Sequence, residues 1–139
     1  MKKKKRLKKL IIVALVLSIY PLFVLIYTWS HVYQSELEGG RHGPLDAYRH
    51  TLASAVVSYT LSENAVSAVT SIMEWGEGET RLMDKHNNMI GAQIGANAKS
   101  FQDIEPEVRK YISEGMINST DPARTTWLPK ERWKDRRAW

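Results

Sequence analysis

The sequence predicts an all-α protein, with an N-terminal transmembrane helix followed by a small bundle of three to four helices. Three observations predict this fold. A basic leader is followed by Leu10–Trp29, a run of 20 residues without a charged side chain. Apolar residues then recur at helical spacing between residues 44 and 115, in segments separated by glycines and capping residues. No segment shows the alternation that is typical of a β-strand.

The positive charge of the chain is concentrated at its N-terminus. The formal net charge is +5, but residues 1–9 carry seven Lys or Arg and no acid, which leaves 13 basic against 15 acidic residues in the remainder. A nucleic-acid partner is therefore not expected, because the body of the chain has no excess of basic residues. The chain has no cysteine, so disulfides and thiolate metal ligands are excluded.

Residues 10–29 are expected to anchor the chain in a membrane, so the lipid bilayer is the first expected partner. At 1.5 Å per residue this helix is about 30 Å long, the thickness of a hydrocarbon core. A cleaved signal peptide is the alternative, but the run is long and no small-residue cleavage site follows it. The positive-inside rule keeps residues 1–9 in the cytoplasm. We expect a single-pass protein of the inner membrane, with residues 30–139 in the periplasm if the source is bacterial.

The remainder divides into a polar linker, residues 30–41, a helical domain, residues 42–115, and a basic and aromatic tail, residues 116–139. The linker is short, so the domain is expected to stay close to the lipid. Helices are expected over about residues 44–61, 63–75, 81–100 and 103–114, the third capped by Thr80. The tail mixes bases with tryptophan, which suits an anionic lipid surface. A solvated tail, or one folded over the bundle, is the alternative.

The sequence HGPLDAYRH, residues 42–50, opens the first helix of the domain with an unusual density of reactive side chains. Pro44 suits the first helical turn, where its missing N–H costs nothing. Asp46 and His50 are four residues apart and therefore share one helix face. Arg49 could bind an anionic substrate group through two hydrogen bonds.

The third helix contains the second informative stretch, MDKHNNMIG at residues 83–91. At 100° per residue, one side of this helix carries Asp84, Asn88, Gly91 and Gly95, with Asn87 at its border. Two glycines inside a helix cost about 1 kcal/mol each relative to alanine. Such a pair usually marks the close approach of another backbone, so we expect a second helix to pack there.

If the first three helices run up, down and up, the first and third are parallel, and their polar N-terminal ends meet at one pole of the bundle. We expect this pole to lie nearer the membrane and to include the C-terminal end of the second helix. The side chains gathered there are His42, Asp46, Arg49, His50, Glu74, Glu77, Asp84, Asn87 and Asn88.

Two chemistries suit this pole. Asp46, His50 and Asp84, with Glu77 or Glu74, have the ligand types that bind a divalent zinc, manganese or iron ion. Acid–base catalysis without a metal is the other, with His50 as the base and a carboxylate orienting it. Asn87 and Asn88 could then position a water molecule or an oxyanion. The remaining histidines, His31 and His86, are expected to be ordinary structural residues.

These observations favour a membrane-anchored, hydrolase-like domain that acts on a cell-envelope substrate, either a phospholipid or peptidoglycan. Anionic lipid or an envelope polymer would then be a partner. The competing class is a non-catalytic accessory or immunity-type protein, in which the polar pole serves structure alone. Asp46, Arg49 and His50 would then cap and brace the opening of their helix.

The two motifs also resemble a family of small, mostly uncharacterised helical domains from bacteria and phages, some attached to secreted toxin-like proteins. The recurring pattern is His-Gly-x-x-Asp-Ala-x-Arg-His, an acidic position, and Met-Asp-x-x-Asn-Asn-x-x-Gly. The resemblance covers about fifty residues and implies that the motif residues act as a set; these are His42, Asp46, Arg49, His50, Asp84, Asn87 and Asn88. It implies no particular reaction. This chain differs from the toxin-attached members in having an anchor, which points to the cell's own envelope.

Overall fold

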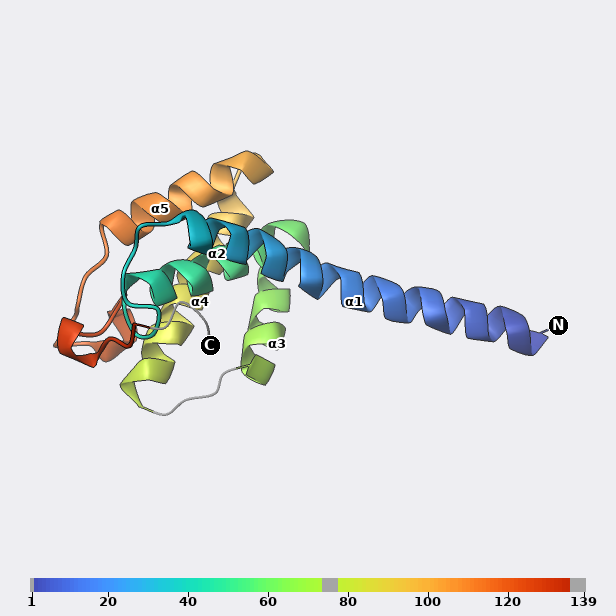
Figure 1. Ribbon diagram of the computed structural model, residues 1–139, viewed down its shortest axis with the longest axis horizontal. Helices are drawn as coiled ribbons and strands as arrows, with labels where there is room; N and C mark the ends of the chain where they lie inside the picture. Colours follow the sequence, from blue (N-terminus) through green and yellow to red (C-terminus); the bar gives the residue numbers. More distant parts are fainter. Residues whose placement is uncertain (1, 74–77, 136–139) are drawn as a thin grey trace.

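The computed structural model describes residues 2–73 and 78–135 and confirms the all-α fold. A long apolar helix, α1 (Lys2–Gln34), leads into a packed bundle of α2 (Pro44–Thr60), α3 (Glu63–Met73), α4 (Glu79–Asn97) and α5 (Ile104–Ser113). Three short 3-10 helices complete the order, namely η1 (Phe101–Asp103), η2 (Pro122–Arg124) and η3 (Lys130–Arg132). The N-terminal half of α1 projects away from the bundle (Figure 1).

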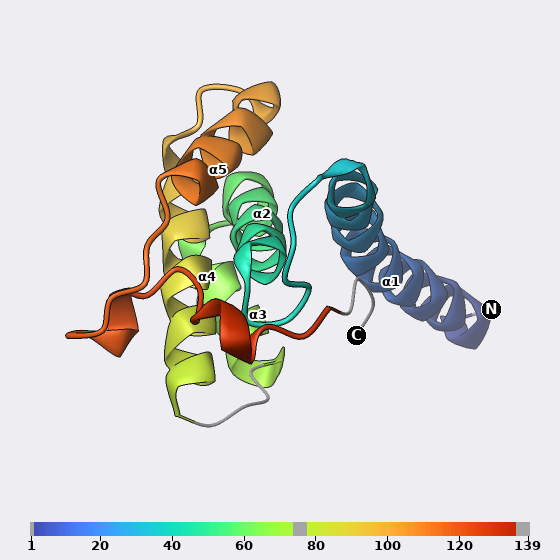
Figure 2. The same cartoon turned by 60° about the vertical axis from the view of Figure 1, so that its left-hand side comes forward.

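Helix α2 is the centre of the bundle, between α1 and α4, with α5 also packed against it (Figure 2). Its apolar residues at helical spacing form a stripe that is largely buried: Leu45, Tyr48, Leu52 and Val56 have at most 1% of their surface exposed. Tyr59, at the end of that stripe, is 39% exposed instead. Because α2 is buried on nearly all sides, most of its side chains are apolar or small.

Helices α2 and α4 are parallel and meet through the two glycines of α4. A Cβ atom on Gly91 would lie 2.3 Å from the carbonyl oxygen of Thr51, and one on Gly95 would lie 2.1 Å from that of Ala55. The prediction that another backbone lies against these glycines is therefore confirmed. Ser58 also donates a hydrogen bond across this contact, to the carbonyl of Ala92 at 2.7 Å.

The boundaries of two elements differ from those expected. Helix α4 begins at Glu79, before Thr80, because Gly78 occupies the N-cap position with a positive φ of 66°. Helix α1 does not end at Trp29 but continues through the expected linker to Gln34. It remains helical because this part packs on the bundle, where Val32 is fully buried.

The orientation of the bundle relative to α1 also corrects an expectation. Tyr20 in α1 contacts Thr60 at the C-terminal end of α2, whereas Trp29 contacts Arg49 near its N-terminal end. The two helices are therefore antiparallel. The end of α2 that carries Asp46 is consequently the end farther from the apolar N-terminal half of α1, not the end nearer to it.

Candidate functional site

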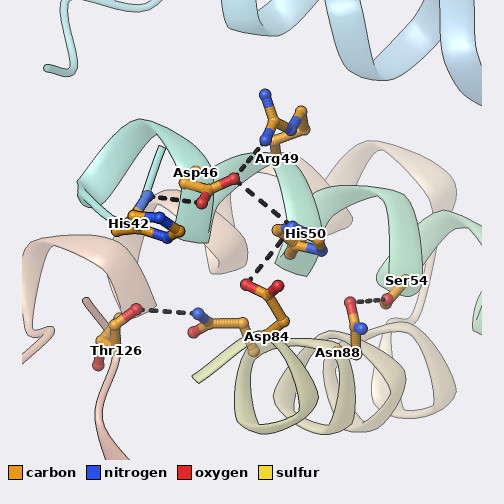
Figure 3. Close-up of polar contacts among 9 residues, drawn as sticks. His42, Asp46, Arg49, His50, Ser54, Asp84, Asn88 and Thr126 are labelled. Carbon is orange, nitrogen blue, oxygen red and sulfur yellow. Dashed lines mark hydrogen bonds and ion pairs between the residues drawn. The ribbon is translucent and has the colours of Figure 1, made fainter. Parts of the chain in front are cut away.

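His50 lies between carboxylates from two different helices (Figure 3). Its Nε2 atom is 3.5 Å from Oδ1 of Asp46, one turn earlier in α2, and 3.6 Å from Oδ1 of Asp84 in α4. One potential metal-ligand atom from each residue lies within 4.8 Å of those of the other two. We call these three residues the Asp–His–Asp cluster. The parallel packing of α2 on α4 thus brings together three of the side chains expected to meet at this pole.

Both carboxylate oxygens of Asp46 have further partners. Oδ2 accepts a hydrogen bond from the backbone N–H of His42 at 2.7 Å, and Oδ1 accepts one from the guanidinium of Arg49. The Asp46 side chain is only 5% exposed. A buried carboxylate held by two donors keeps one orientation, which fixes the direction in which it faces His50.

His42 reaches Asp46 through its backbone, because it adopts a positive φ of 65° at the turn into α2. This conformation is uncommon for a residue with a side chain and needs support from neighbouring structure. The support comes from the tail: Leu128 donates a backbone hydrogen bond to the His42 carbonyl at 2.8 Å. The imidazole Nδ1 of His42 is buried without a hydrogen-bond partner.

The tail, as far as it is described, folds over this end of the bundle, which is one of the arrangements considered from the sequence. Arg41 and Lys134 form an antiparallel bridge with backbone hydrogen bonds of 3.0 and 3.1 Å. The indole of Trp133 lies against Gly39 and Gly43, where a Cβ atom would lie 3.0 Å from it. The glycines on either side of Arg41 therefore allow the chain to cross closely beneath the tail.

Arg49 connects the cluster to α1. Its guanidinium lies over the ring of Trp29, 5.5 Å from the ring centroid, while bonding to Asp46. Its side chain is 14% exposed. A guanidinium stacked on an indole and hydrogen-bonded to a carboxylate is well fixed, so we infer that Arg49 orients Asp46.

The two asparagines have different surroundings. Asn88 lies next to the cluster, and its Oδ1 accepts a hydrogen bond from Ser54 at 2.9 Å. Asn87 is fully buried and faces the tail and α5: its Nδ2 donates to the Thr126 carbonyl at 2.9 Å, and its Oδ1 accepts from the Tyr111 hydroxyl at 3.0 Å. Asn87 thus holds the tail in place rather than pointing at His50.

The electrostatics of the cluster favour a charged imidazole. Desolvation alone would lower the pKa of His50, but the acceptor oxygen and charge of Asp46 and the charge of Asp84 outweigh it, so that pKa is raised. Burial alone would raise the pKa of Asp46. It is lowered instead, because His50, Arg49 and the His42 N–H stabilise the carboxylate. The cluster therefore attracts positive charge, whether a proton or a metal ion.

The remaining predicted residues lie elsewhere. Glu74 and Glu77 lie outside the described residues. His86 is half-buried at the edge of the bundle, its ring 6.4 Å from that of Tyr111, and burial lowers its pKa. His31 packs on Tyr27 at a ring distance of 4.7 Å. Neither histidine belongs to the Asp–His–Asp cluster, and the Nδ1 atom of His86 is buried without a hydrogen-bond partner.

Sequence reasoning missed two contributors to the site. Trp29, the last residue of the apolar run, supports Arg49, and its place in that run gives no sign of this role. Thr126, which holds Asn87 through its carbonyl, carries no sequence signal, because any residue could supply that atom. Comparison with family models, with curated proteins and with solved structures finds no match for this chain. The site is therefore interpreted from its own geometry.

Proposed function

We propose that this chain is a membrane-anchored, metal-dependent hydrolase-like domain that acts on a cell-envelope substrate. One observation carries the proposal: a single nitrogen, Nε2 of His50, faces an oxygen of Asp46 and an oxygen of Asp84 at 3.5 and 3.6 Å. These separations exceed the 2.7–2.9 Å typical of a charge-assisted hydrogen bond. Ligands bound to one metal ion at about 2.0–2.1 Å in a tetrahedron lie about 3.4 Å apart. The two distances from His50 therefore fit a shared cation better than direct hydrogen bonding, and the ligand atoms of Asp46 and Asp84 lie within 4.8 Å of each other.

A site with three protein ligands leaves coordination positions open for water and substrate, as in catalytic metal centres. One imidazole and two carboxylates suit zinc, manganese or iron. A divalent ion there would lower the pKa of a bound water molecule and so supply a nucleophile near neutral pH. The His50 and Asp84 side chains are 31% and 24% exposed, so a solute can approach the cluster.

The envelope location rests on α1. This helix is long and apolar enough to cross a membrane, with a mean hydropathy of 2.7 in its most apolar window. The basic leader at its N-terminus favours placing the bundle on the side opposite the cytoplasm. The substrates within reach there are phospholipid headgroups and peptidoglycan. The resemblance of the two motifs to phage and bacterial helical domains supports treating their residues as one functional set.

The test is hydrolysis of envelope material by the full chain in detergent or in vesicles. Purified peptidoglycan and phospholipid vesicles would each be incubated with the protein and Zn²⁺ or Mn²⁺, with chelator in parallel. We expect product from one of the two, lost on chelation and lost in His50→Ala. His86→Ala is the matched control, because it removes a half-buried histidine outside the cluster. Full activity of His50→Ala would contradict the proposal.

The accessory alternative is favoured by a separate observation, that Asp46 already has two protein donors and could serve structure alone. A purely structural cluster predicts that His50→Ala lowers stability in proportion to lost contacts. It also predicts no metal dependence in any property of the protein. Unfolding midpoints measured with and without added Mn²⁺ separate the two functions, because binding to the folded state raises the midpoint.

A further inference from the structure

The bundle is docked along the second half of α1 rather than attached to its end. One face of that half is covered by the bundle, and its buried residues recur at helical spacing; they are Val24, Thr28 and Val32. The docking begins at Tyr20, whose hydroxyl lies 2.5 Å from Oγ1 of Thr60 at the end of α2. The bundle therefore lies beside residues that the sequence places within the membrane span.

This docking shortens the part of α1 that is free to cross a membrane. Of the apolar run, only residues 10–19 precede the docked part, and ten helical residues are about 15 Å long. A hydrocarbon core is about 30 Å thick. If all of Leu10–Trp29 were in hydrocarbon, the end of α2 would lie near mid-bilayer. The exposed polar residues beside it, Glu63, Asn64 and Lys99, would lie there too, where burial of a charge in hydrocarbon is strongly unfavourable.

The end of the bundle that meets Tyr20 is aromatic and partly apolar at its surface. Phe23, Tyr27 and Tyr59 all pack on Phe101, with ring centroids 6.2, 5.0 and 5.9 Å away. Leu61, in the corner between α2 and α3, is 57% exposed. Aromatic rings with polar groups next to them favour the boundary between hydrocarbon and headgroups.

We propose that this end of the bundle, which we call the α2–α3 corner (Tyr59–Leu61 with Phe101), rests in the interfacial layer of the lipid leaflet opposite Lys2–Lys9. The proposal rests on the membrane anchoring in the proposed function. The hydrocarbon boundary then lies near Tyr20–Phe23, and the spanning segment is about residues 7–23. Seventeen residues are at the lower limit for a spanning helix, and Lys8 and Lys9 can extend towards the headgroups.

This placement has a consequence for the cluster. His50 lies ten residues before Thr60 in α2, which is about 15 Å along the helix axis. The Asp–His–Asp cluster is then on the aqueous side of the headgroups rather than at the level of the acyl chains. A substrate that reaches it is a headgroup or a polymer of the aqueous layer, not a lipid tail.

Single-cysteine labelling tests the proposal without background, because the chain has no cysteine of its own. The full chain would be reconstituted in vesicles of phosphatidylcholine and phosphatidylglycerol, with a nitroxide label at Leu61→Cys, Leu15→Cys or Met116→Cys. Leu15 is in the part of α1 that precedes Tyr20. Met116 is 60% exposed, and its carbonyl accepts a hydrogen bond from the N–H of Thr126, two residues before Leu128, which bonds to His42. The measurement is collision of each label with oxygen, which enters lipid, and with a nickel chelate, which does not.

We expect the Leu15 label to be in lipid, the Met116 label to be in water, and the Leu61 label to be severalfold less accessible to nickel than the Met116 label. If the Leu61 label is as accessible to nickel as the Met116 label while the Leu15 label is in lipid, the α2–α3 corner does not rest in the interfacial layer. The membrane anchor is then unaffected. A Leu15 label that is also accessible overturns the anchor and the proposal with it. All three positions are exposed, so the three labelled variants should have the same helix content by circular dichroism as the parent chain.

Discussion

The Nε2 atom of His50 lies 3.6 Å from Oδ1 of Asp84, although the two residues belong to α2 and α4 and are separated by the whole of α3. This contact depends on how closely α2 and α4 approach each other. It follows from the glycines that let the carbonyls of Thr51 and Ala55 touch the backbone of α4. The contact between His50 and Asp84 therefore depends on the same close packing of α2 on α4 that Gly91 and Gly95 allow.

Gly91→Ala should separate these helices and destabilise the protein. Alanine would gain about 1 kcal/mol of helix propensity, but its Cβ would lie 2.3 Å from a backbone oxygen that cannot move alone. Overpacking of this kind costs about 1–3 kcal/mol or more, so a net loss is expected. Denaturant unfolding in detergent measures it. Gln93→Ala, at an exposed position of α4, is the control and should change stability by less than about 0.5 kcal/mol. A Gly91→Ala protein as stable as the parent would contradict the close packing.

Asn87→Ala should weaken the attachment of the tail and leave the Asp–His–Asp cluster intact. The substitution leaves the Thr126 carbonyl and the Tyr111 hydroxyl without the partner that each has now. A buried polar group without a partner costs about 1–3 kcal/mol. Limited proteolysis of the tail should accelerate, while metal affinity stays unchanged. Asn97→Ala, on the exposed side of α4, is the matched control; a fall in metal affinity specific to Asn87→Ala would show that it belongs to the site.

Arg49→Lys should lower the affinity of the cluster for a divalent ion without unfolding the chain. Lysine cannot reproduce the guanidinium that both stacks on Trp29 and bonds to Asp46. Loss of a residue that orients a metal ligand typically costs 10–100-fold in affinity. Arg109→Lys, at the exposed Glu105 pair, is the control and should leave affinity unchanged. Equal affinities of Arg49→Lys and Arg109→Lys for the divalent ion would contradict the role of Arg49 in orienting Asp46.

The stability of the metal-free protein should depend on pH through the cluster. The pKa of His50 is raised by Asp46 and Asp84 against desolvation and the opposing charge of Arg49. Its stabilisation is therefore complete below the ordinary value of 6.5 and is lost as the pH rises through the raised pKa. The pKa of Asp46 is lowered, so its contribution is present above the ordinary 3.8 and is lost as the pH falls through the lowered pKa.

The measurement is the unfolding free energy of the parent chain minus that of His50→Gln, in chelator, as a function of pH. The difference should be constant just below pH 6.5 and should shrink at higher pH. A difference that grows above pH 6.5 would mean that the folded protein prefers neutral His50, contrary to the arrangement of the two carboxylates.

The fold and the meeting of Asp46, His50 and Asp84 could be predicted from the sequence because they depend on local, periodic signals. Helical spacing defines the elements, and a pair of glycines four residues apart indicates which face of α4 receives a neighbour. The extent of α1 could not be predicted in this way. Ser30–Gln34 is polar enough to be taken for a linker, but it is helical and packs on the bundle through Val32, which is fully buried.

The orientation of the bundle on α1 and the role of Asn87 depend on contacts between distant segments. Nothing in the sequence shows that Tyr20 pairs with Thr60, or that the tail returns to Arg41. Asn87 and Asn88 are adjacent in a polar motif, yet 100° of helix rotation turns them to different partners. Tertiary structure thus separates residues that a motif groups together.

Calorimetric titration of the full chain in detergent with Mn²⁺ or Zn²⁺, beside Asp84→Asn and His50→Ala, measures whether the Asp–His–Asp cluster binds a divalent ion. We expect the parent protein to bind one ion per chain and both variants to lose that binding, since each removes a ligand of the Asp–His–Asp cluster. Absence of binding by the parent chain, or binding that persists unchanged in both variants, would contradict this expectation.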